Sequence, residues 1–550
     1  MLEGLMQDDF QLTLHHQLHR MRSVHPHGEV ITLTDGGIVR ASYGEIAARV
    51  DRLARVLGQL GIGPGDRVGT FAWNNQRHFE LYMAVPCIGA VLHTLNIRLN
   101  ASQLTYIVGH AKDEVIFVDE SLVPLLSQLA YTFEGVRHYV VMSASANPGE
   151  CDLSALAGAL HYEELIAAAD DGPFDYPHVD ERQAAALCYT SGTTGNPKCV
   201  LYSHRSISLH STASLMTDAL GLSRRDKSLV VVPMFHVNAW GIPHASALAG
   251  ADLLLPDRFL QAEPLAKLIE AERPSIMACV PTIYADLLRY AEANGSDLSS
   301  IKNAACGGSA VPRELMRAYE ERHGVNVFQA WGMTETSPVA TYSRPDETGV
   351  HDDAYWDMRA KQGKPIPWVE ARLVDDSGDE VPWDGESTGE LEVRGPWILA
   401  HYYSDESGET RFDEGWLRTG DIAAIDEQAF VQITDRSKDV IKSGGEWISS
   451  VELENEVMAH PDVIEAAVIA KPDEKWAERP LCCVVTREGC TLSAEDLIEH
   501  LRPRVARWWL PDEFAFVAEV PKTSVGKFDK KVLRAHLQEG TLEGRVRVGA

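Results

Sequence analysis

Short apolar runs alternate with segments of helical period along most of the chain, and this alternation constrains the fold more than any other feature. Segments such as Tyr43–Leu60 and Pro264–Glu272 have the helical period. Buried strands joined by helices form βαβ units, so the pattern predicts an α/β protein with mainly parallel sheets flanked by helices. The runs that we interpret as buried strands are Asp66–Trp73, Glu114–Val118, Val136–Met142, Ala184–Tyr189, Ser228–Pro233, Asp252–Leu255, Ile276–Val280, Lys302–Cys306 and Val325–Ala330.

The pattern changes near residue 370, where the apolar runs become shorter and Gly, Pro and Asp punctuate them. Three such runs lie at Glu370–Val374, Gly389–Arg394 and Ala429–Thr434. Shorter strands punctuated by turn residues indicate a change of architecture at this point. We therefore expect a small barrel-like subdomain at the end of the N-terminal part.

A charged run, Asp435-Arg-Ser-Lys-Asp439, follows this subdomain and indicates an exposed connection. Beyond it, Ser449-Ser-Val-Glu452 has the capping-box pattern of a helix that extends to about His460. A chain of 550 residues exceeds what one hydrophobic core usually organises. We predict a large N-terminal domain at 1–434, a hinge at 435–440 and a small α+β C-terminal domain at 441–550.

The charge balance argues against several classes of partner. Lys and Arg total 50 and Asp and Glu total 80, so the formal net charge is −30. Nucleic acids and anionic membranes are bound through basic surfaces, so we expect neither as a partner. An anionic ligand would have to be held by local loops and helix ends, because the negative net charge of the protein repels it.

The cysteines and the hydropathy pattern indicate a cytoplasmic protein. The nine cysteines are odd in number and include no C-x-x-C pair, which argues against a disulfide scaffold or a zinc knuckle. The first twenty residues are acidic where a signal peptide would be basic, and no run of 18 apolar residues follows. We expect no integral membrane segment and a reducing compartment.

The sharpest local signal is the string Tyr189-Thr-Ser-Gly-Thr-Thr-Gly-Asn-Pro-Lys198, which follows an apolar strand directly. Its glycines let backbone N–H groups approach a ligand closely, and its hydroxyl groups donate hydrogen bonds, as phosphate oxygens require. It is not a Walker A loop, because Asn196 and Pro197 separate Gly195 from the lysine. The string predicts a phosphate site, with an ordinary surface turn as the alternative.

This string and five further motifs, in the same order, resemble the acyl-adenylate-forming superfamily of acyl-CoA synthetases, firefly luciferase and peptide-synthetase adenylation domains. The resemblance covers roughly residues 40 to 535. Several of the motifs follow expected strands, and ligands of open α/β sheets bind beyond the carboxyl ends of strands. We therefore expect the motifs to meet in one crevice. The further motifs are Gly307-Gly-Ser-Ala310, Ala330-Trp-Gly-Met-Thr-Glu335, Thr419-Gly-Asp421, Asp435-Arg-Ser-Lys-Asp439 and Pro521-Lys-Thr-Ser-Val-Gly-Lys527.

The resemblance implies roles for individual residues. The implied catalytic residues are Lys527, Thr334 and Glu335, and the implied Mg²⁺ ligands are Glu335 and Thr190. The residues implied to bind ATP or AMP are Thr190, Ser191, Gly192, Thr193, Thr194, Gly195, Lys198, Gly308, Ser309, Ala330, Trp331, Gly332, Asp421 and Arg436. Trp331 would lie against adenine, Asp421 would accept the ribose hydroxyls, and Lys527 would bridge the carboxylate and the α-phosphate.

The segment Phe235-His-Val-Asn-Ala-Trp-Gly241 resembles medium- and long-chain fatty acyl-CoA synthetases, in which this tryptophan gates the acyl tunnel. An ordinary core role for Trp240 and a structural role for His236 stay open. Ligases for short acids such as 3-methylmercaptopropionate share these motifs, so the chain length also stays open. The residues implied to line the acyl pocket or to meet CoA are His236, Trp240, Gly307, Lys442, Gly444, Glu446 and Trp447.

The implied reaction has two steps, with ATP, Mg²⁺ and coenzyme A beside a small carboxylic acid. The acid and ATP form acyl-AMP and pyrophosphate, and a thiol then displaces AMP while the C-terminal domain changes its orientation. An acyl-AMP ligase that loads a carrier protein, a luciferase-like oxidase and a non-catalytic nucleotide-binding protein are the alternatives, in decreasing order of support. The sequence leaves a homodimer open.

Overall fold

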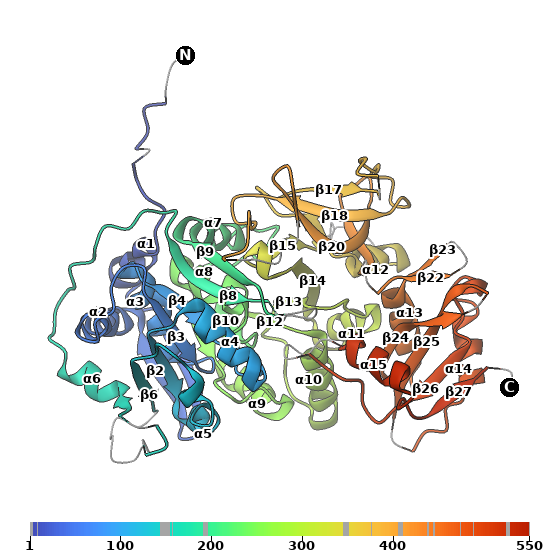
Figure 1. Ribbon diagram of the computed structural model, residues 1–550, viewed down its shortest axis with the longest axis horizontal. Helices are drawn as coiled ribbons and strands as arrows, with labels where there is room; N and C mark the ends of the chain where they lie inside the picture. Colours follow the sequence, from blue (N-terminus) through green and yellow to red (C-terminus); the bar gives the residue numbers. More distant parts are fainter. Residues whose placement is uncertain are drawn as a thin grey trace.

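The computed structural model describes residues 4–7, 9–143, 154–156, 158–190, 196–344, 351–375, 377–404, 411–436, 439–443, 446–473, 475–487, 489–523 and 528–548. Two large sheets with helices form the N-terminal part, and a smaller domain, orange to red in Figure 1, lies next to α10 and α11. Among the described residues, no helix combines the length and the apolar character that crossing a bilayer requires.

The first large sheet has nine strands in the order β16-β15-β14-β13-β12-β10-β11-β1-β2. Its central strands are parallel, and β2, β15 and β16 pair antiparallel at the two edges. The bounds are β1 Glu29–Thr34, β2 Gly37–Ser42, β10 Lys227–Val230, β11 Asp252–Leu255, β12 Ile276–Cys279, β13 Asn303–Gly307, β14 Asn326–Gly332, β15 Val339–Tyr342 and β16 Lys364–Pro365.

The second large sheet has seven strands in the order β7-β6-β5-β3-β4-β8-β9. Only β9 runs antiparallel to its neighbour, so β8 and β9 form a hairpin at one edge. The bounds are β3 Arg67–Phe71, β4 Val91–Thr94, β5 Val115–Asp119, β6 His138–Met142, β7 Leu160–His161, β8 Ala184–Tyr189 and β9 Cys199–Ser203.

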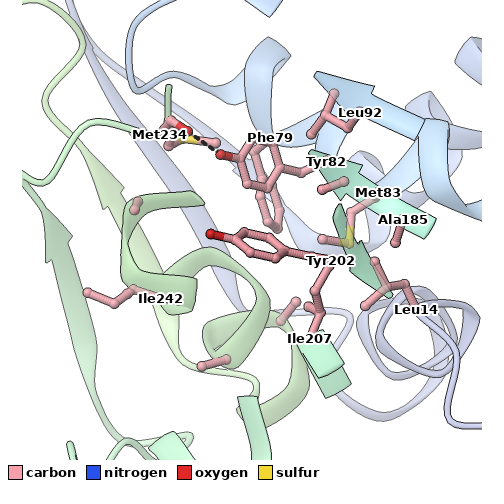
Figure 2. Packing of buried hydrophobic residues seen from close by; sticks show 14 of the residues in the cluster. Leu14, Phe79, Tyr82, Met83, Leu92, Ala185, Tyr202, Ile207, Met234 and Ile242 are labelled. Atoms are coloured by element: carbon pink, nitrogen blue, oxygen red, sulfur yellow. Dashed lines mark hydrogen bonds between the residues drawn. The ribbon is translucent and has the colours of Figure 1, made fainter. Parts of the chain in front are cut away.

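Helices cover these sheets on both faces. The largest hydrophobic cluster draws residues from both sheets and from α2, α3, α7 and α8 between them. Figure 2 shows part of it, with the Tyr82 hydroxyl of α3 donating a hydrogen bond to the carbonyl of Met234 after β10. The helices of the N-terminal part are α1 His15–His19, α2 Tyr43–Gln59, α3 Gln76–Cys87, α4 Ala101–Ala111, α5 Val123–Leu126, α6 Tyr162–Ala168, α7 His204–Ser214, α8 Ile242–Ala249, α9 Ala262–Glu272, α10 Pro281–Asn294, α11 Arg313–His323 and α12 Asp353–Ala360.

A five-stranded antiparallel sheet follows, and then a six-stranded sheet that forms the C-terminal domain. One face of the six-stranded sheet packs on α13 and α14, and the other packs on α15. The strands of the five-stranded sheet are β17 Glu370–Val374, β18 Gly389–Arg394, β19 Phe412–Asp413, β20 Trp416–Ile425 and β21 Val431–Arg436. The C-terminal elements are β22 Ile441–Ser443, β23 Glu446–Ile448, α13 Ser450–Met458, β24 Val463–Asp473, β25 Ala477–Thr486, α14 Ala494–Leu501, β26 Glu513–Phe516, α15 Lys530–Glu539 and β27 Arg545–Arg547.

The predicted fold class is confirmed, and the differences lie at the strand ends. β13 includes Gly307, and β14 continues through Trp331 to Gly332, so these residues belong to strands where the sequence predicted loops. Backbone pairing extends these strands, because Gly307 lies opposite Ala330 and Trp331 lies opposite Thr341 of β15. The apolar runs of the sequence did not predict β15. The site residues at these positions therefore rest on sheet backbone.

Candidate active site

A cavity of about 1390 Å³ opens between the sheet ends and the C-terminal domain. It is bordered by residues that follow β8, β10 and β13, by the end of β14, and by residues of the C-terminal domain. The expected convergence of the sequence motifs is therefore found in the part of the chain that the structure describes. The predicted site residues that line it are Thr190, Lys198, His236, Trp240, Gly308, Ser309, Ala330, Trp331, Gly332, Thr334, Glu335 and Asp421.

The two ends of the predicted phosphate loop are held together at the cavity wall. The Thr190 N–H donates to the Lys198 carbonyl over 2.9 Å, and the Lys198 N–H donates to Thr190 Oγ1 over 3.0 Å. The Lys198 ammonium lies 4.9 Å from the ring centroid of Tyr402. The end of β8 and the start of β9 therefore lie side by side, next to Lys198. Ser191, Gly192, Thr193, Thr194 and Gly195 lie outside the described residues.

Thr334 and Glu335 form a buried turn directly after β14. The Tyr202 hydroxyl donates to the Thr334 carbonyl over 2.7 Å, and the Leu399 N–H donates to the Glu335 carbonyl over 2.8 Å. The Tyr402 hydroxyl donates to Glu335 Oε1 over 2.5 Å. Burial and the neighbouring Glu335 carboxylate raise the pKa of Tyr402 above its usual range, so this phenol stays a donor at neutral pH.

Trp331 and Asp421, which the sequence assigned to adenine and ribose separately, contact each other directly. The Trp331 indole N–H donates to Asp421 Oδ2 over 3.0 Å, and both side chains are buried at the cavity wall. One hydrogen bond therefore fixes the indole plane and the carboxylate together. Gly332 follows, and a Cβ there would lie 1.8 Å from the Pro338 carbonyl oxygen, so only glycine fits.

His236 and Trp240 line another part of the cavity, on a turn with unusual backbone geometry. Val237, Asn238, Ala239 and Trp240 all have left-handed φ angles, between +41° and +56°. A Cβ on Gly307 would lie 3.1 Å from the Trp240 ring and 2.4 Å from the Ala330 carbonyl oxygen. Glycine at 307 thus makes room for the neighbouring strand as well as for the indole.

The C-terminal domain contributes the far wall. Lys527 lies outside the described residues, while Thr523 and Phe528, on either side of its loop, both line the cavity. Two other lysines near that loop are held in ion pairs: Lys522 with Glu465 over 2.5 Å, and Lys530 with Glu454 over 2.8 Å. The described residues on both sides of Lys527 therefore lie at this cavity.

The remaining sequence candidates lie in and around the expected hinge. In the backbone pairing of β20 and β21, Arg436 lies opposite Asp421. Lys442 belongs to β22, and Glu446 and Trp447 belong to β23, but the side chains of these four candidates and all of Gly444 lie outside the described residues. Asp435 lines the cavity, and its Oδ2 accepts a 2.6 Å hydrogen bond from the Ser450 N–H.

Sequence reasoning missed Tyr202, Tyr402 and Arg411. Tyr202 and Tyr402 hold the Thr334–Glu335 turn, and an Arg411 guanidinium nitrogen lies 4.0 Å from Glu335 Oε1. No periodicity marks these positions, because each acts through a contact far away in the sequence. The only available signal was the adjacent pair Tyr402-Tyr403 shortly before Thr419-Gly-Asp421.

Comparison with known proteins agrees with this geometry. The family model described as "AMP-binding enzyme" matches residues 21–403, and the model "AMP-binding enzyme C-terminal domain" matches residues 452–527. The fold also matches the crystal structure of an anthranilate CoA ligase in complex with anthranoyl-AMP, with a TM-score of 0.87 at 24% identity, covering 98% of this chain and 99% of that one.

Curated relatives extend over nearly the whole chain. A medium-chain-fatty-acid–CoA ligase of Ectopseudomonas oleovorans is 44% identical over 92% of both chains. A long-chain-fatty-acid–CoA ligase of Thermus thermophilus is 44% identical over 96% of both, and a 3-methylmercaptopropionyl-CoA ligase of Ruegeria lacuscaerulensis is 43% identical over 94% of this chain and 95% of its own. The chain therefore belongs to the AMP-binding enzyme family, in the fatty acyl-CoA synthetase branch of the acyl-adenylate-forming superfamily.

Proposed function

We propose that this protein is an ATP-dependent, AMP-forming acid–thiol ligase that activates a medium- or long-chain fatty acid and transfers it to coenzyme A. One observation carries the proposal: a single cavity joins the ends of the phosphate loop, the Thr334–Glu335 turn, the Trp331–Asp421 pair and the attachment points of the Lys527 loop. The substrate class is supported by relatives that carry out this reaction on medium- and long-chain fatty acids.

In the first half-reaction, a carboxylate oxygen of the acid bonds to the α-phosphorus of ATP, and the bond to pyrophosphate breaks. Lys198 and Thr190 would hold the departing phosphates, and Thr334 would contact the α-phosphate. Lys527 would bridge the carboxylate and the α-phosphate, where a point charge on a flexible side chain follows the developing negative charge. The enzyme needs no nucleophile of its own, because ATP supplies the activation.

The residues present fit a Mg²⁺ ion. Enzymes that bind nucleotides hold Mg²⁺ by one or two carboxylates together with substrate phosphates, so the buried Glu335, with Thr190 lining the same cavity, is a sufficient donor set. A bound Mg²⁺ would neutralise charge on the leaving pyrophosphate. Oε1 of Glu335 is engaged by Tyr402, and no described residue bonds Oε2.

In the second half-reaction, the CoA sulfur bonds to the acyl carbonyl carbon, the bond to AMP breaks, and the thiol proton is released. The proposal places a domain of residues 441–550 on a hinge at 435–440, so that it pivots against residues 1–434. Gly444, Glu446 and Trp447 would enter the site in the second orientation, with Lys442 nearby. This division is supported by the separate six-stranded sheet and its own hydrophobic clusters.

The test is CoA-dependent AMP release over linear acids from butanoate to hexadecanoate, with benzoate as a non-linear acid. We expect the highest kcat/KM at medium or long chain length, and pyrophosphate exchange with the same acids when CoA is omitted. Absence of pyrophosphate exchange with every acid would contradict the proposal. AMP release that requires an acyl carrier protein in place of CoA would redirect it to a carrier-loading ligase.

A short sulfur-containing acid is the second candidate substrate, because a 3-methylmercaptopropionyl-CoA ligase is nearly as similar as the fatty-acid ligases. The same assay separates the two when 3-methylmercaptopropionate and hexanoate are compared side by side. A kcat/KM at least tenfold higher for the thioether acid than for hexanoate would favour the second candidate.

The proposed location is the cytoplasm, supported by the state of the cysteines. All eight cysteines among the described residues are free thiols, and seven of them are buried. Disulfides are rare in reducing compartments, so free thiols agree with that location. Light scattering on the purified protein tests the homodimer that the sequence leaves open.

A further inference from the structure

The segment Leu399–Tyr403 connects two parts of the cavity wall that are far apart in the sequence. At one end, the Leu399 N–H donates to the Glu335 carbonyl over 2.8 Å. At the other end, the Tyr403 N–H donates to the carbonyl of Cys199, the residue after Lys198, over 3.0 Å. The segment therefore ties the turn that carries Glu335 to the strand that begins at the end of the phosphate loop.

Tyr402 lies between these two backbone anchors and contacts both functional side chains. Its hydroxyl donates to Glu335 Oε1 over 2.5 Å, and its ring lies 4.9 Å from the Lys198 ammonium. The side chain is buried, so little water screens either contact. A hydrogen bond to a carboxylate and a cation–π contact are both directional, and each limits how its partner can turn.

We infer that Tyr402 is a positioning residue that couples the cation of the phosphate loop to the carboxylate that would hold the metal. Its hydroxyl donates a hydrogen bond to Oε1 of Glu335 and so leaves Oε2 to bind a cation. Its ring holds the Lys198 ammonium at the cavity wall before a triphosphate arrives. Both groups are thus ordered in advance, which lowers the cost of ordering them when the metal–nucleotide complex binds.

The inference rests on the proposed function for the identity of the nucleotide, while its test is a binding measurement that does not depend on the acid. The variants are Tyr402→Phe, which removes the hydroxyl and keeps the ring, and Tyr402→Leu, which removes both. Tyr139→Phe is the matched control, because Tyr139 also donates its hydroxyl, to the Ala130 carbonyl over 3.2 Å, on a different part of the fold.

Binding of ATP with and without Mn²⁺ is measured by calorimetry, and bound Mn²⁺ is counted by electron paramagnetic resonance. A hydrogen bond to a charged group contributes roughly one order of magnitude in affinity, so we expect Tyr402→Phe to bind Mn²⁺·ATP about 10-fold more weakly. Its affinity for metal-free ATP should stay unchanged, whereas Tyr402→Leu should weaken both. Tyr139→Phe should bind both forms like the wild type.

Two further measurements separate positioning from a general loss of structure. If Tyr402 acts through Glu335, the double variant Tyr402→Phe/Glu335→Gln should bind Mn²⁺·ATP no more weakly than Glu335→Gln alone. Thioester formation from supplied acyl-AMP and CoA should fall less in Tyr402→Phe than acyl-AMP formation does, because acyl-AMP carries no pyrophosphate.

The inference would be overturned if Tyr402→Phe weakened the binding of Mn²⁺·ATP and of metal-free ATP equally. It would also be overturned if Tyr402→Phe bound both forms as tightly as the wild type. Additive losses in the double variant would also overturn it. Failure of the proposed function is distinguishable: the wild type would then bind Mn²⁺·ATP, with the expected Tyr402 effects, and release no AMP with any fatty acid.

Discussion

Lys530 and Glu454 form a buried ion pair whose removal should destabilise the C-terminal domain strongly. The Lys530 ammonium lies 2.8 Å from Glu454 Oε1 and donates to Ser450 Oγ over 2.7 Å, and the two charged side chains are only 10% and 8% exposed. Burial opposes the charge on the lysine, but Glu454 and the nearby Asp435 outweigh burial, so the pKa of Lys530 is raised. Burial also raises the pKa of Glu454, and the Lys530 ammonium opposes that rise, so each charge supports the other.

The variant Lys530→Met keeps the volume and leaves Glu454 without its cation. Removing one partner of a buried pair costs about 3–5 kcal/mol, because the remaining charge is buried without compensation. Hydrogen exchange measured by mass spectrometry on the full-length protein reports this loss of stability locally, in the peptides of α13 and β24. At 1.36 kcal/mol per tenfold, we expect exchange there to accelerate by roughly two to four orders of magnitude.

The double variant Lys530→Met/Glu454→Gln is the control. Glutamine removes the charge and keeps an acceptor for the Val468 N–H, which donates to Glu454 Oε1 over 2.7 Å. We expect the double variant to recover to within about 1 kcal/mol of the wild type, because residue 454 no longer carries a charge that needs the lysine. The reasoning is refuted if Lys530→Met alone changes exchange less than tenfold, or if the double variant is no more protected than the single one.

Three further outcomes are expected. Lys527→Ala should lose acyl-AMP formation and still convert supplied acyl-AMP and CoA to the thioester; equal loss of both half-reactions would argue against the bridging role. Gly307→Ala should lower the free energy of unfolding by about 1–3 kcal/mol, measured by urea titration, because its Cβ would lie 2.4 Å from the Ala330 carbonyl oxygen. Burial lowers the pKa of His210 to about 4, so stability should fall as the pH drops from about 6.5 towards 4, where only the unfolded chain takes up the proton. The variant His210→Gln should show a shallower decline in thermal stability over that range, and an unchanged slope would contradict this assignment.

Much of the fold was predictable because the buried strands of a parallel sheet correspond to continuous apolar runs in the sequence. The bounds of β8 and β11 match the predicted runs, and α2 ends one residue before its predicted end. The antiparallel strands β17 and β18 also have their predicted bounds, whereas β9, β15 and β20 were not identified. β20 carries Asp421 and alternates in burial in its first half, and β9 and β15 are placed by antiparallel pairing with β8 and β14.

The site was predictable at the level of motifs but not at the level of contacts. The strings around Thr190, Thr334 and Asp421 indicated which residues would meet, and the cavity contains them. The hydrogen bond from Trp331 to Asp421 joins residues ninety positions apart. Such long-range contacts depend on the register of the sheets and on the geometry of the turns. Neither can be predicted from the residues near the contact in a single sequence.

The turn that carries Trp240 illustrates how the site is maintained at a cost in stability. Consecutive left-handed residues other than glycine cost roughly 1–2 kcal/mol each, and four of them occur here, from Val237 to Trp240. Buried contacts oppose this cost, since the Asn238 side-chain oxygen accepts from the Cys188 thiol over 3.5 Å. Strain persists only where surrounding structure imposes it, and here it directs an indole into the cavity beside the glycine of β13. Among the described residues, the longest run of left-handed backbone outside glycine thus coincides with the segment whose resemblance indicated the acyl substrate, and we interpret the strain as the cost of placing Trp240.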